Sequence, residues 1–173
     1  MPRPPKDEEF TDFVHASWPS LYRTAYLLLG DHAAAEDLVQ TALAKTYAAW
    51  SKVRSVEAAP AFARTTLVNT ANSWFRRRSW GRERPTDPIP ERGAPAPDPS
   101  DRPAVVAALA TLPPRQRAVV VLRYYEDLSV AQVARILGCA EGTVKSQTSD
   151  ALAKLRVELG EAVVPETLGA SHD

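Results

Sequence analysis

The chain has little of several features that would mark a specialised class of protein. Its 173 residues include one cysteine, Cys139, so an internal disulfide framework is excluded, and this fits a reducing compartment. Its 21 basic and 21 acidic residues give a formal net charge of zero. The molecule as a whole therefore attracts neither nucleic acid nor a charged membrane surface, and any such contact must use a local patch.

Long apolar stretches are also missing. Apolar runs such as residues 25–29 and 118–122 are far shorter than the roughly 20 residues needed to cross a bilayer. Prolines and acidic residues occupy the N-terminus, where a secretory signal would need an apolar segment. We therefore expect a soluble, cytoplasmic protein that makes no membrane contact.

No residue pattern typical of an enzyme is present. The histidines, His15, His32 and His172, are scattered, Cys139 has no partner at metal-ligand spacing, and there is no glycine-rich phosphate loop. We expect neither catalysis nor a bound metal or cofactor. For Cys139 itself, a redox-sensing role is the alternative to a small residue in a turn.

Proline is abundant, and its distribution divides the sequence. Seven of the 15 prolines lie between Pro85 and Pro103, in a stretch with almost no large apolar residue. Such a composition favours extended conformations over packed elements. The blocks on either side lack alternation of apolar and polar residues, so we expect an all-α protein of two small helical domains joined by a flexible linker. The expected segments are a first domain at 1–80, the linker at 81–100, a second domain at 101–160 and a tail at 161–173.

Two helices are expected at the start of the first block. Ser17 is a candidate cap for a helix that has Pro19 in its first turn and ends at Gly30. Asp31 is a candidate cap for the next helix, which would run to about Trp50. The apolar residues expected to face inward on this second helix are Ala35, Leu38, Val39, Ala42, Leu43 and Tyr47.

A third helix is expected to begin near Pro60, after a loop over residues 51–59, and it ends in positive charge. Three arginines, Arg76, Arg77 and Arg78, follow one another there, with Trp74, Phe75 and Trp80 close by. Arginines neutralise phosphates and aromatic rings stack on bases, which suits partly single-stranded DNA. A solvated helix end is the alternative reading of the same residues.

The second block contains the clearest motif. Asp101 is a candidate cap for a helix to Thr111, a break follows at Pro113 and Pro114, and another helix runs to about Tyr125. After these helices, Ser129 and Gln132 have the spacing of a capping box, Gly138 suits a left-handed turn, and a further helix is expected from Glu141. This arrangement predicts a helix-turn-helix.

The last helix of this motif has the small and polar side chains that DNA recognition requires. Small side chains allow close approach to the major groove, and polar ones bond to base edges and phosphates. The alternative is an ordinary helix pair with a solvated face. The candidate DNA-contacting residues are Thr143, Lys145, Ser146, Gln147, Ser149 and Asp150.

Three segments, in this order, resemble the extracytoplasmic-function (ECF) sigma factors, the two-domain promoter-recognition subunits of bacterial RNA polymerase. They are residues 35–40 (AEDLVQ), 67–71 (LVNTA) and 137–146 (LGCAEGTVKS). Asn69, the arginine triplet and the stretch TVKSQT are most similar to the actinobacterial sigma-E-like subgroup. The resemblance implies a factor that binds core polymerase and promoter DNA and starts transcription, and it leaves an anti-sigma protein open as a further partner.

The resemblance also implies roles for individual residues. The second helix would contact the clamp helices of the polymerase β′ subunit, and the second domain would lie by the β flap. The loop over residues 51–59 and the third helix would capture a flipped-out base of the −10 element and hold the displaced strand. The implied polymerase-binding residues are Glu36, Asp37, Gln40 and Thr41. The implied −10-binding residues are Arg64, Asn69, Ser73, Arg76, Arg77 and Arg78.

Three positions depart from the family pattern. Many relatives have arginine where this chain has Gln147, and arginine is common in place of Asp150, whose carboxylate would repel phosphate unless it paired with Lys154. Ala140 stands where a capping residue is frequent. The rival interpretation, a helix-turn-helix regulator that does not associate stably with core polymerase, would leave the first block unexplained.

Overall fold

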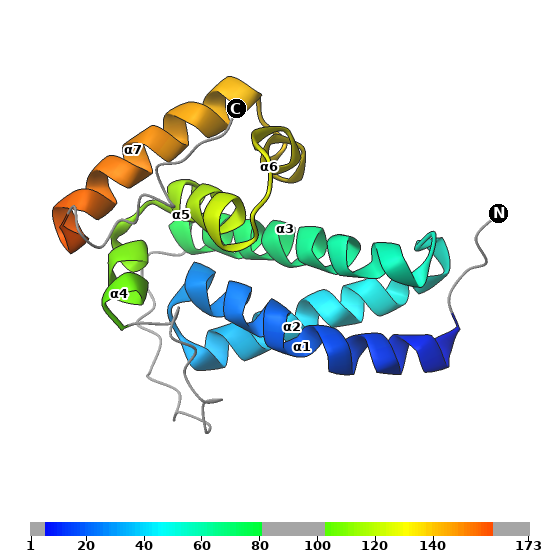
Figure 1. Ribbon diagram of the computed structural model, residues 1–173. Coiled ribbons are helices and arrows are strands. Elements are labelled where there is room, and N and C mark those ends of the chain that lie inside the picture. Colours follow the sequence, from blue (N-terminus) through cyan, green and yellow to red (C-terminus); the bar gives the residue numbers. More distant parts are fainter. Residues whose placement is uncertain (1–5, 81–102, 161–173) are drawn as a thin grey trace. The chain divides into compact units, whose positions relative to one another are not determined.

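The computed structural model describes residues 6–80 and 103–160, except for the side chains of residues 78–80 (Figure 1). The chain divides into two compact units, an N-terminal unit within residues 1–92 and a C-terminal unit within residues 93–173. In the described residues all regular structure is helical, as predicted. The linker over residues 81–100, the tail over residues 161–173 and the cap at Asp101 lie outside the described residues.

Three long helices make up the N-terminal unit. They are α1 (Asp7–Leu29), α2 (His32–Ala48) and α3 (Ala59–Trp80), with two 3₁₀ turns, η1 (Trp50–Lys52) and η2 (Val56–Ala58), between α2 and α3. Helix α2 packs against both α1 and α3, and α1 also contacts α3. Large apolar side chains from all three helices are fully buried between them, namely Leu28, Leu38, Val39, Leu67 and Val68.

The turn between α1 and α2 follows the prediction. Gly30 ends α1 in the left-handed conformation (φ 72°), which glycine adopts without steric cost. Asp31 caps α2, because its carboxylate accepts a hydrogen bond from the backbone N–H of Ala34 at 2.8 Å. Pro60 lies in the first turn of α3, also as predicted.

The predicted start of α1 is wrong. Helix α1 begins at Asp7, so Ser17 is not its cap and Pro19 lies inside the helix. An interior proline removes one helical hydrogen bond and costs about 3 kcal/mol. Other interactions stabilise the early turns: Asp7, Glu8 and Glu9 complement the helix dipole, and the Glu9 carboxylate accepts from the Lys6 backbone N–H at 2.6 Å.

The expected inward position of Tyr47 is also wrong. The other apolar residues of the predicted set on α2 are buried, whereas the Tyr47 side chain is 50% exposed. Tyr47 lies in the last turn of α2, where its ring contacts Phe10 of α1 with 4.8 Å between ring centroids. Its apolar ring therefore packs at the edge of the core rather than within it.

Short helices make up the C-terminal unit. They are α4 (Pro103–Thr111), α5 (Pro114–Val120), a single π-helical turn η4 (Val121–Tyr125) that continues α5, α6 (Val130–Leu137) and the longer α7 (Glu141–Leu159). Helix α7 packs against α4, α5 and α6. The buried core includes Leu109, Leu112, Val119, Leu122, Val133, Val144 and Leu155.

Arginine side chains hold the short helices of this unit together. The guanidinium of Arg117 on α5 donates to the carbonyls of Leu109, Ala110 and Leu112 at 2.8, 3.2 and 3.0 Å, and these carbonyls lie at the end of α4. Burial lowers the pKa of Arg117 from its usual value, but an arginine remains charged. Arg123 donates in the same way to the carbonyl of Leu128 at 2.7 Å, which fixes the segment before α6.

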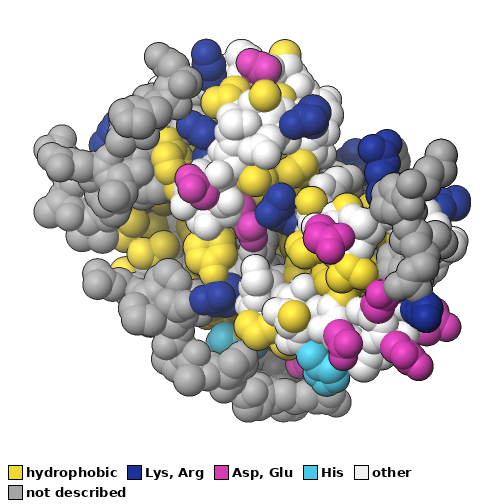
Figure 2. Space-filling view, turned by 45° about the vertical axis from the view of Figure 1, so that its right-hand side comes forward, with side chains coloured by type: hydrophobic (Ala, Val, Ile, Leu, Met, Phe, Trp, Pro, Cys, Tyr) yellow, Lys and Arg dark blue, Asp and Glu magenta, His cyan; other side chains and the backbone are white. Residues whose placement is uncertain are grey.

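Charged side chains of both signs are scattered over the described surface (Figure 2). In the space-filling view, acidic side chains gather at the lower right, and apolar side chains reach the surface in several patches between polar ones (Figure 2). Burial raises the pKa of the Tyr124 phenol, while the neighbouring charges of Arg123 and Arg156 lower it. The described surface thus carries both positively and negatively charged side chains, in keeping with the balanced charge of the sequence.

Candidate nucleic-acid and protein interfaces

The predicted polymerase-binding residues lie together on α2. Asp37 and Gln40 are exposed, three residues apart, and therefore on one side of the helix. Glu36 and Thr41 flank them and are half-buried, and the Gln40 amide lies 3.4 Å from a Glu36 carboxylate oxygen. The opposite side of α2 is fully buried. These four side chains form a polar stripe, here named the α2 stripe, on a helix whose opposite side is held by packing.

A contact between α2 and α3 fixes the rotation of α3. The ammonium of Lys45 on α2 donates to the hydroxyl of Thr70 on α3 at 3.1 Å, and this hydroxyl in turn donates to the Thr66 carbonyl at 2.7 Å. Thr70 is 2% exposed. Because its neighbour Thr70 faces inward, Asn69 is turned outward and its side chain is exposed.

Most of the predicted −10-binding residues of α3 share its outward side. Asn69 and Arg76 are exposed, Ser73 is half-buried one turn after Asn69, and Arg77 is exposed at the edge of this side. The side chain of Arg78 is outside the described residues. Arg64 is placed differently: at about 100° of rotation per residue it lies about 140° around α3 from Asn69, and its side chain is half-buried.

The exposed aromatic ring on the Asn69 side of α3 is Phe62, which the sequence reading did not single out. Phe62 is 38% exposed and lies two turns before Asn69. Trp74 and Phe75, which the sequence suggested as stacking platforms, are half-buried and face away from Asn69. The signal for Phe62 was present in the sequence as an aromatic residue seven positions before Asn69, on the same helical side.

The helix-turn-helix of the C-terminal unit has the predicted local geometry. Ser129 and Gln132 form a reciprocal capping box, with hydrogen bonds of 2.8 and 3.1 Å. Gly138 ends α6 in the left-handed conformation (φ 65°), and the backbone N–H of Cys139 donates to the Ala134 carbonyl at 3.0 Å. Helix α7 starts after Ala140, which makes no side-chain cap, as predicted.

The predicted DNA-contacting residues form the outer side of the first turns of α7. Lys145, Ser146, Ser149 and Asp150 are exposed, and Thr143 and Gln147 are half-buried at the flanks. The Ser146 hydroxyl donates to the Thr143 carbonyl at 3.1 Å, so it keeps close to the helix. One turn before Ser146 lies Gly142, which is also exposed and was not in the predicted set. Small groups thus line this side and permit close approach of a duplex.

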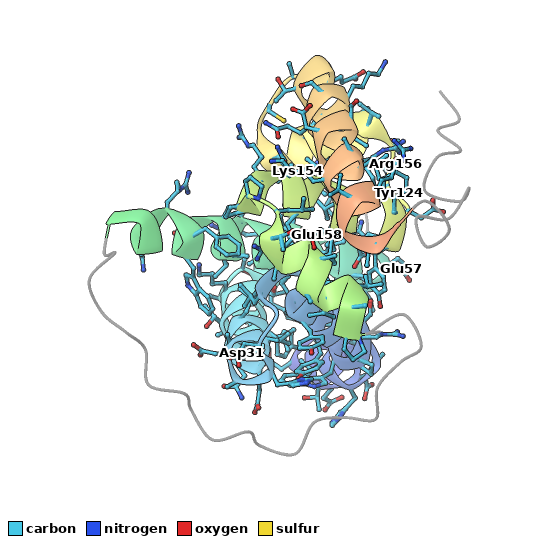
Figure 3. The ribbon with its side chains drawn as sticks, turned by 90° about the vertical axis from the view of Figure 1, so that its left-hand side faces the viewer. Asp31, Glu57, Tyr124, Lys154, Arg156 and Glu158 are labelled. Carbon is cyan, nitrogen blue, oxygen red and sulfur yellow. The ribbon has the colours of Figure 1, made fainter. Side chains whose placement is uncertain are left out.

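The pairing of Asp150 with Lys154, which the sequence left open, is not formed. Lys154 lies on α7 (Figure 3). Its ammonium instead donates to the side-chain oxygen of Gln116 on α5, at 3.1 Å. Gln116 is largely buried, at 9% exposure, and the lysine satisfies its oxygen. The Asp150 carboxylate therefore remains as an exposed negative charge on the outer side of α7.

Two features are absent from the described residues. Among them, no three or more histidine, cysteine or acidic side chains are grouped so that they could hold a metal ion. None of the helices in residues 6–80 and 103–160 is both long and apolar enough to cross a membrane.

Comparison with known proteins accounts for both units. The family Sigma-70 region 2 matches residues 13–81, and the family Sigma-70, region 4 matches residues 102–155. The chain is 41% identical to the RNA polymerase sigma-E factor of Streptomyces coelicolor over 155 residues, which cover 87% of this chain and 86% of that protein. It is 37% identical to the ECF RNA polymerase sigma factor SigL of Mycobacterium tuberculosis, covering 82% and 83% of the two chains.

A solved structure is similar over nearly the full length. The sigma factor RpoE from Bartonella quintana, crystallised in complex with the anti-sigma factor NepR, matches with a TM-score of 0.69 and 27% identity, covering 95% of this chain and 99% of that one. A regulator that had only a helix-turn-helix would leave the region 2 match without an explanation. The chain therefore belongs to the sigma-70 family as an ECF sigma factor, a non-enzymatic subunit that binds core RNA polymerase and promoter DNA and directs the start of transcription.

Proposed function

We propose that the outward side of α2 is the surface by which this sigma factor binds core polymerase. Asp37 and Gln40 would make the central contacts with the β′ clamp helices, and Glu36 and Thr41 would lie at their edge. The exposure of Asp37 and Gln40 above a fully buried opposite side supports this role. Polar groups on a rigid helix bind with little loss of conformational freedom.

The loop over residues 51–59, here named the base-capture loop, and the outward side of α3 would take the −10 element. Asn69 can both donate and accept hydrogen bonds, as reading the edge of a flipped base requires. Exposed Phe62 offers a ring on which an unstacked base can lie, and Arg76 would hold the displaced strand by its phosphates. Ser73, Arg77 and Arg78 would extend this contact, and Arg64 would act from the side of the helix.

The first turns of α7 would read the −35 element as duplex. Ser146 and Ser149 permit close approach, Gln147 can form paired hydrogen bonds with adenine, and Thr143 and Lys145 would contact phosphates. Asp150 can accept a hydrogen bond from the amino group of a cytosine, and this would give its carboxylate a favourable place in the groove. The β flap of the polymerase would hold this unit.

The observation that carries the proposal is the division of labour within one helical bundle. The proposed polymerase contacts lie on α2 and the proposed −10 contacts on α3, and the Lys45–Thr70 hydrogen bond ties the two helices together. Such a bundle can hold a melted strand against the enzyme that will copy it. The domain limits 1–80, 81–100, 101–160 and 161–173 remain our proposal, as does a cytoplasmic location.

An anti-sigma protein would be a further partner. The similar RpoE of Bartonella quintana was crystallised with the anti-sigma factor NepR. In this chain, a protein that covered the α2 stripe would exclude core polymerase by direct competition. Both ligands would then need Asp37 and Gln40, which makes the competition measurable with the purified proteins.

Asn69→Ala tests the assignment of the −10 contact. In run-off transcription with core polymerase we expect a loss of about tenfold or more, since an unread base leaves buried polar groups unpaired. Permanganate reactivity of −10 thymines should fall with it, while binding to −35 duplex and to core polymerase should stay unchanged. Gln40→Ala is the reciprocal control and should weaken core binding only. Equal loss of −10 opening and −35 binding in Asn69→Ala would contradict the assignment.

A further inference from the structure

The base-capture loop is anchored at its first end by an aromatic cluster that no sequence pattern indicated. The cluster consists of Phe10 and Phe13 from α1, Tyr47 from α2, and Trp50 from η1. The Phe10 ring lies 4.8 Å from that of Tyr47 and 5.0 Å from that of Trp50, and the Phe13 ring lies 5.6 Å from that of Trp50. Edge-to-face and tilted contacts at these distances are favourable and directional.

Trp50 is the member of the cluster that connects two parts of the fold. Its side chain is 3% exposed, and its indole N–H donates to the backbone carbonyl of Lys6 at 3.0 Å, 44 positions away in the sequence. The same carbonyl also accepts the first helical hydrogen bond of α1, from the N–H of Phe10 at 3.2 Å. The side chain of Trp50 is therefore fixed by the first turn of α1.

The backbone of Trp50 fixes the loop in turn. Its carbonyl accepts from the N–H of Val53 at 3.2 Å, and the Val53 side chain is 3% exposed. At the far end of the loop, Ala58 donates to the Ser55 carbonyl at 3.1 Å, and Ala59 is fully buried. Between these anchors the loop presents exposed side chains to solvent, namely Ser51, Lys52, Arg54, Val56 and Glu57.

We propose that Trp50, held by the first turn of α1, is a positioning residue that sets where the base-capture loop meets the flipped −10 base. This inference rests on the proposed role of the loop. It gives a function to the early turns of α1. Trp50 itself is buried and does not touch DNA, so it acts through the path from Lys6 to Val53. A pocket that reads a base edge depends on its position to within about an ångström, because small displacements cost large factors in affinity.

The test uses the full-length protein in holoenzyme with core polymerase. Trp50→Phe keeps an aromatic ring beside Phe10 and Phe13 but cannot donate to the Lys6 carbonyl. Phe10→Leu acts on the cluster from the α1 side and leaves Trp50 intact. Trp18→Phe is the matched control, since Trp18 lies on α1 and belongs to none of the ring contacts of the cluster.

The probes are single-stranded oligonucleotides carrying the −10 sequence found by mapping transcript starts, with each base replaced in turn. The readout is the ratio of affinities for the original and the replaced base, measured for each holoenzyme. A loss of folded protein lowers both affinities equally and leaves this ratio unchanged. A displaced loop lowers the ratio, and we expect a fall of about tenfold at the captured base for Trp50→Phe, a fall for Phe10→Leu, and no change for Trp18→Phe.

The outcomes separate the inference from the function on which it rests. If the wild-type ratio is close to one at every base, the loop captures no base, and the proposed function of the loop is wrong. If the wild type discriminates and Trp50→Phe discriminates equally well, Trp50 is a packing residue and the positioning role is wrong. A similar fall in Trp18→Phe would overturn it too, because the effect would not belong to the cluster.

Discussion

Both units of this sigma factor bury apolar side chains between helices, but the helices differ in length and in how their ends are stabilised. The N-terminal unit uses helices of 23, 17 and 22 residues, whose long apolar sides bury one another. The C-terminal unit uses helices of 9, 7, 8 and 19 residues with a π-helical turn of 5. Short helices have many free backbone groups relative to their length. Side chains of Arg117, Arg123, Ser129 and Gln132 satisfy several of these groups.

The difference extends to the surfaces that we assign to function. In the N-terminal unit, the proposed contacts with core polymerase and with single-stranded DNA lie on two helices and a loop. In the C-terminal unit, the outer side of one helix, α7, carries all of the predicted base contacts. In α7, the buried residues Val144, Ala151, Leu152 and Leu155 and the proposed DNA contacts lie on different sides of the same helix.

The largest effect should come from reversing a charge on the N-terminal unit. Asp37→Lys would place an ammonium group where a carboxylate meets the polymerase, and we expect core binding to weaken by about 2–5 kcal/mol, or roughly thirtyfold and more. Equilibrium titration of labelled core polymerase measures it. Asp12→Lys, the same charge change at another exposed helical position, should bind normally. If both substitutions weaken core binding equally, the α2 stripe is not the polymerase-binding surface.

An intermediate effect should follow from removing a polar support of the C-terminal unit. Arg117→Met takes away three hydrogen bonds to the end of α4 and should lower the stability of this unit by about 2 kcal/mol. All four tryptophans lie within residues 1–80, so tryptophan fluorescence in urea reports on the N-terminal unit, and hydrogen exchange reports on each unit. Arg115→Met, at an exposed position of α5, is the control. A matching shift of the fluorescence transition would show that the units do not unfold independently.

The smallest effect concerns the exposed charge on α7. Asp150→Asn should tighten binding to duplex of random sequence by about two- to threefold at low salt, because a carboxylate repels phosphates, and the gain should vanish at high salt. Glu158→Gln, two turns later on the same helix, is the control and should have no effect (Figure 3). On the mapped −35 element the same substitution should cost affinity if Asp150 accepts from a cytosine. No change on either duplex would exclude Asp150 from the interface.

The C-terminal unit was more predictable because its signals are local. The Ser129–Gln132 pair, Gly138 and the double proline at 113 and 114 each act on neighbouring residues, so the sequence alone predicts the helix ends there. The polar partner of Lys154 was missed, because Gln116 is 38 positions away and only the packing of α5 on α7 brings them together.

In the N-terminal unit, the sequence predicted the helix ends that local capping residues set. It did not predict the features that depend on packing between residues far apart in the sequence. Gly30 and Asp31 set the turn between α1 and α2 by their own conformations. The first turns of α1 were missed because Ser17 and Pro19 resemble a helix start, and the aromatic contacts that outweigh this signal join Phe10 to residues of α2 and η1. The same contacts explain Tyr47, since a tyrosine ring can pack at the edge of a core while staying half exposed.

Pro19 has one more consequence for α1. Because a proline nitrogen carries no hydrogen, the His15 carbonyl receives no bond from it, and the hydrogen-bond ladder of α1 is interrupted at that point. The part of α1 before Pro19 is held by the aromatic contacts, and the part after Pro19 is held by packing within the three-helix core. Such a helix can open in two steps, so the amides of the early turns would exchange with solvent at a rate set by the aromatic contacts rather than by global unfolding.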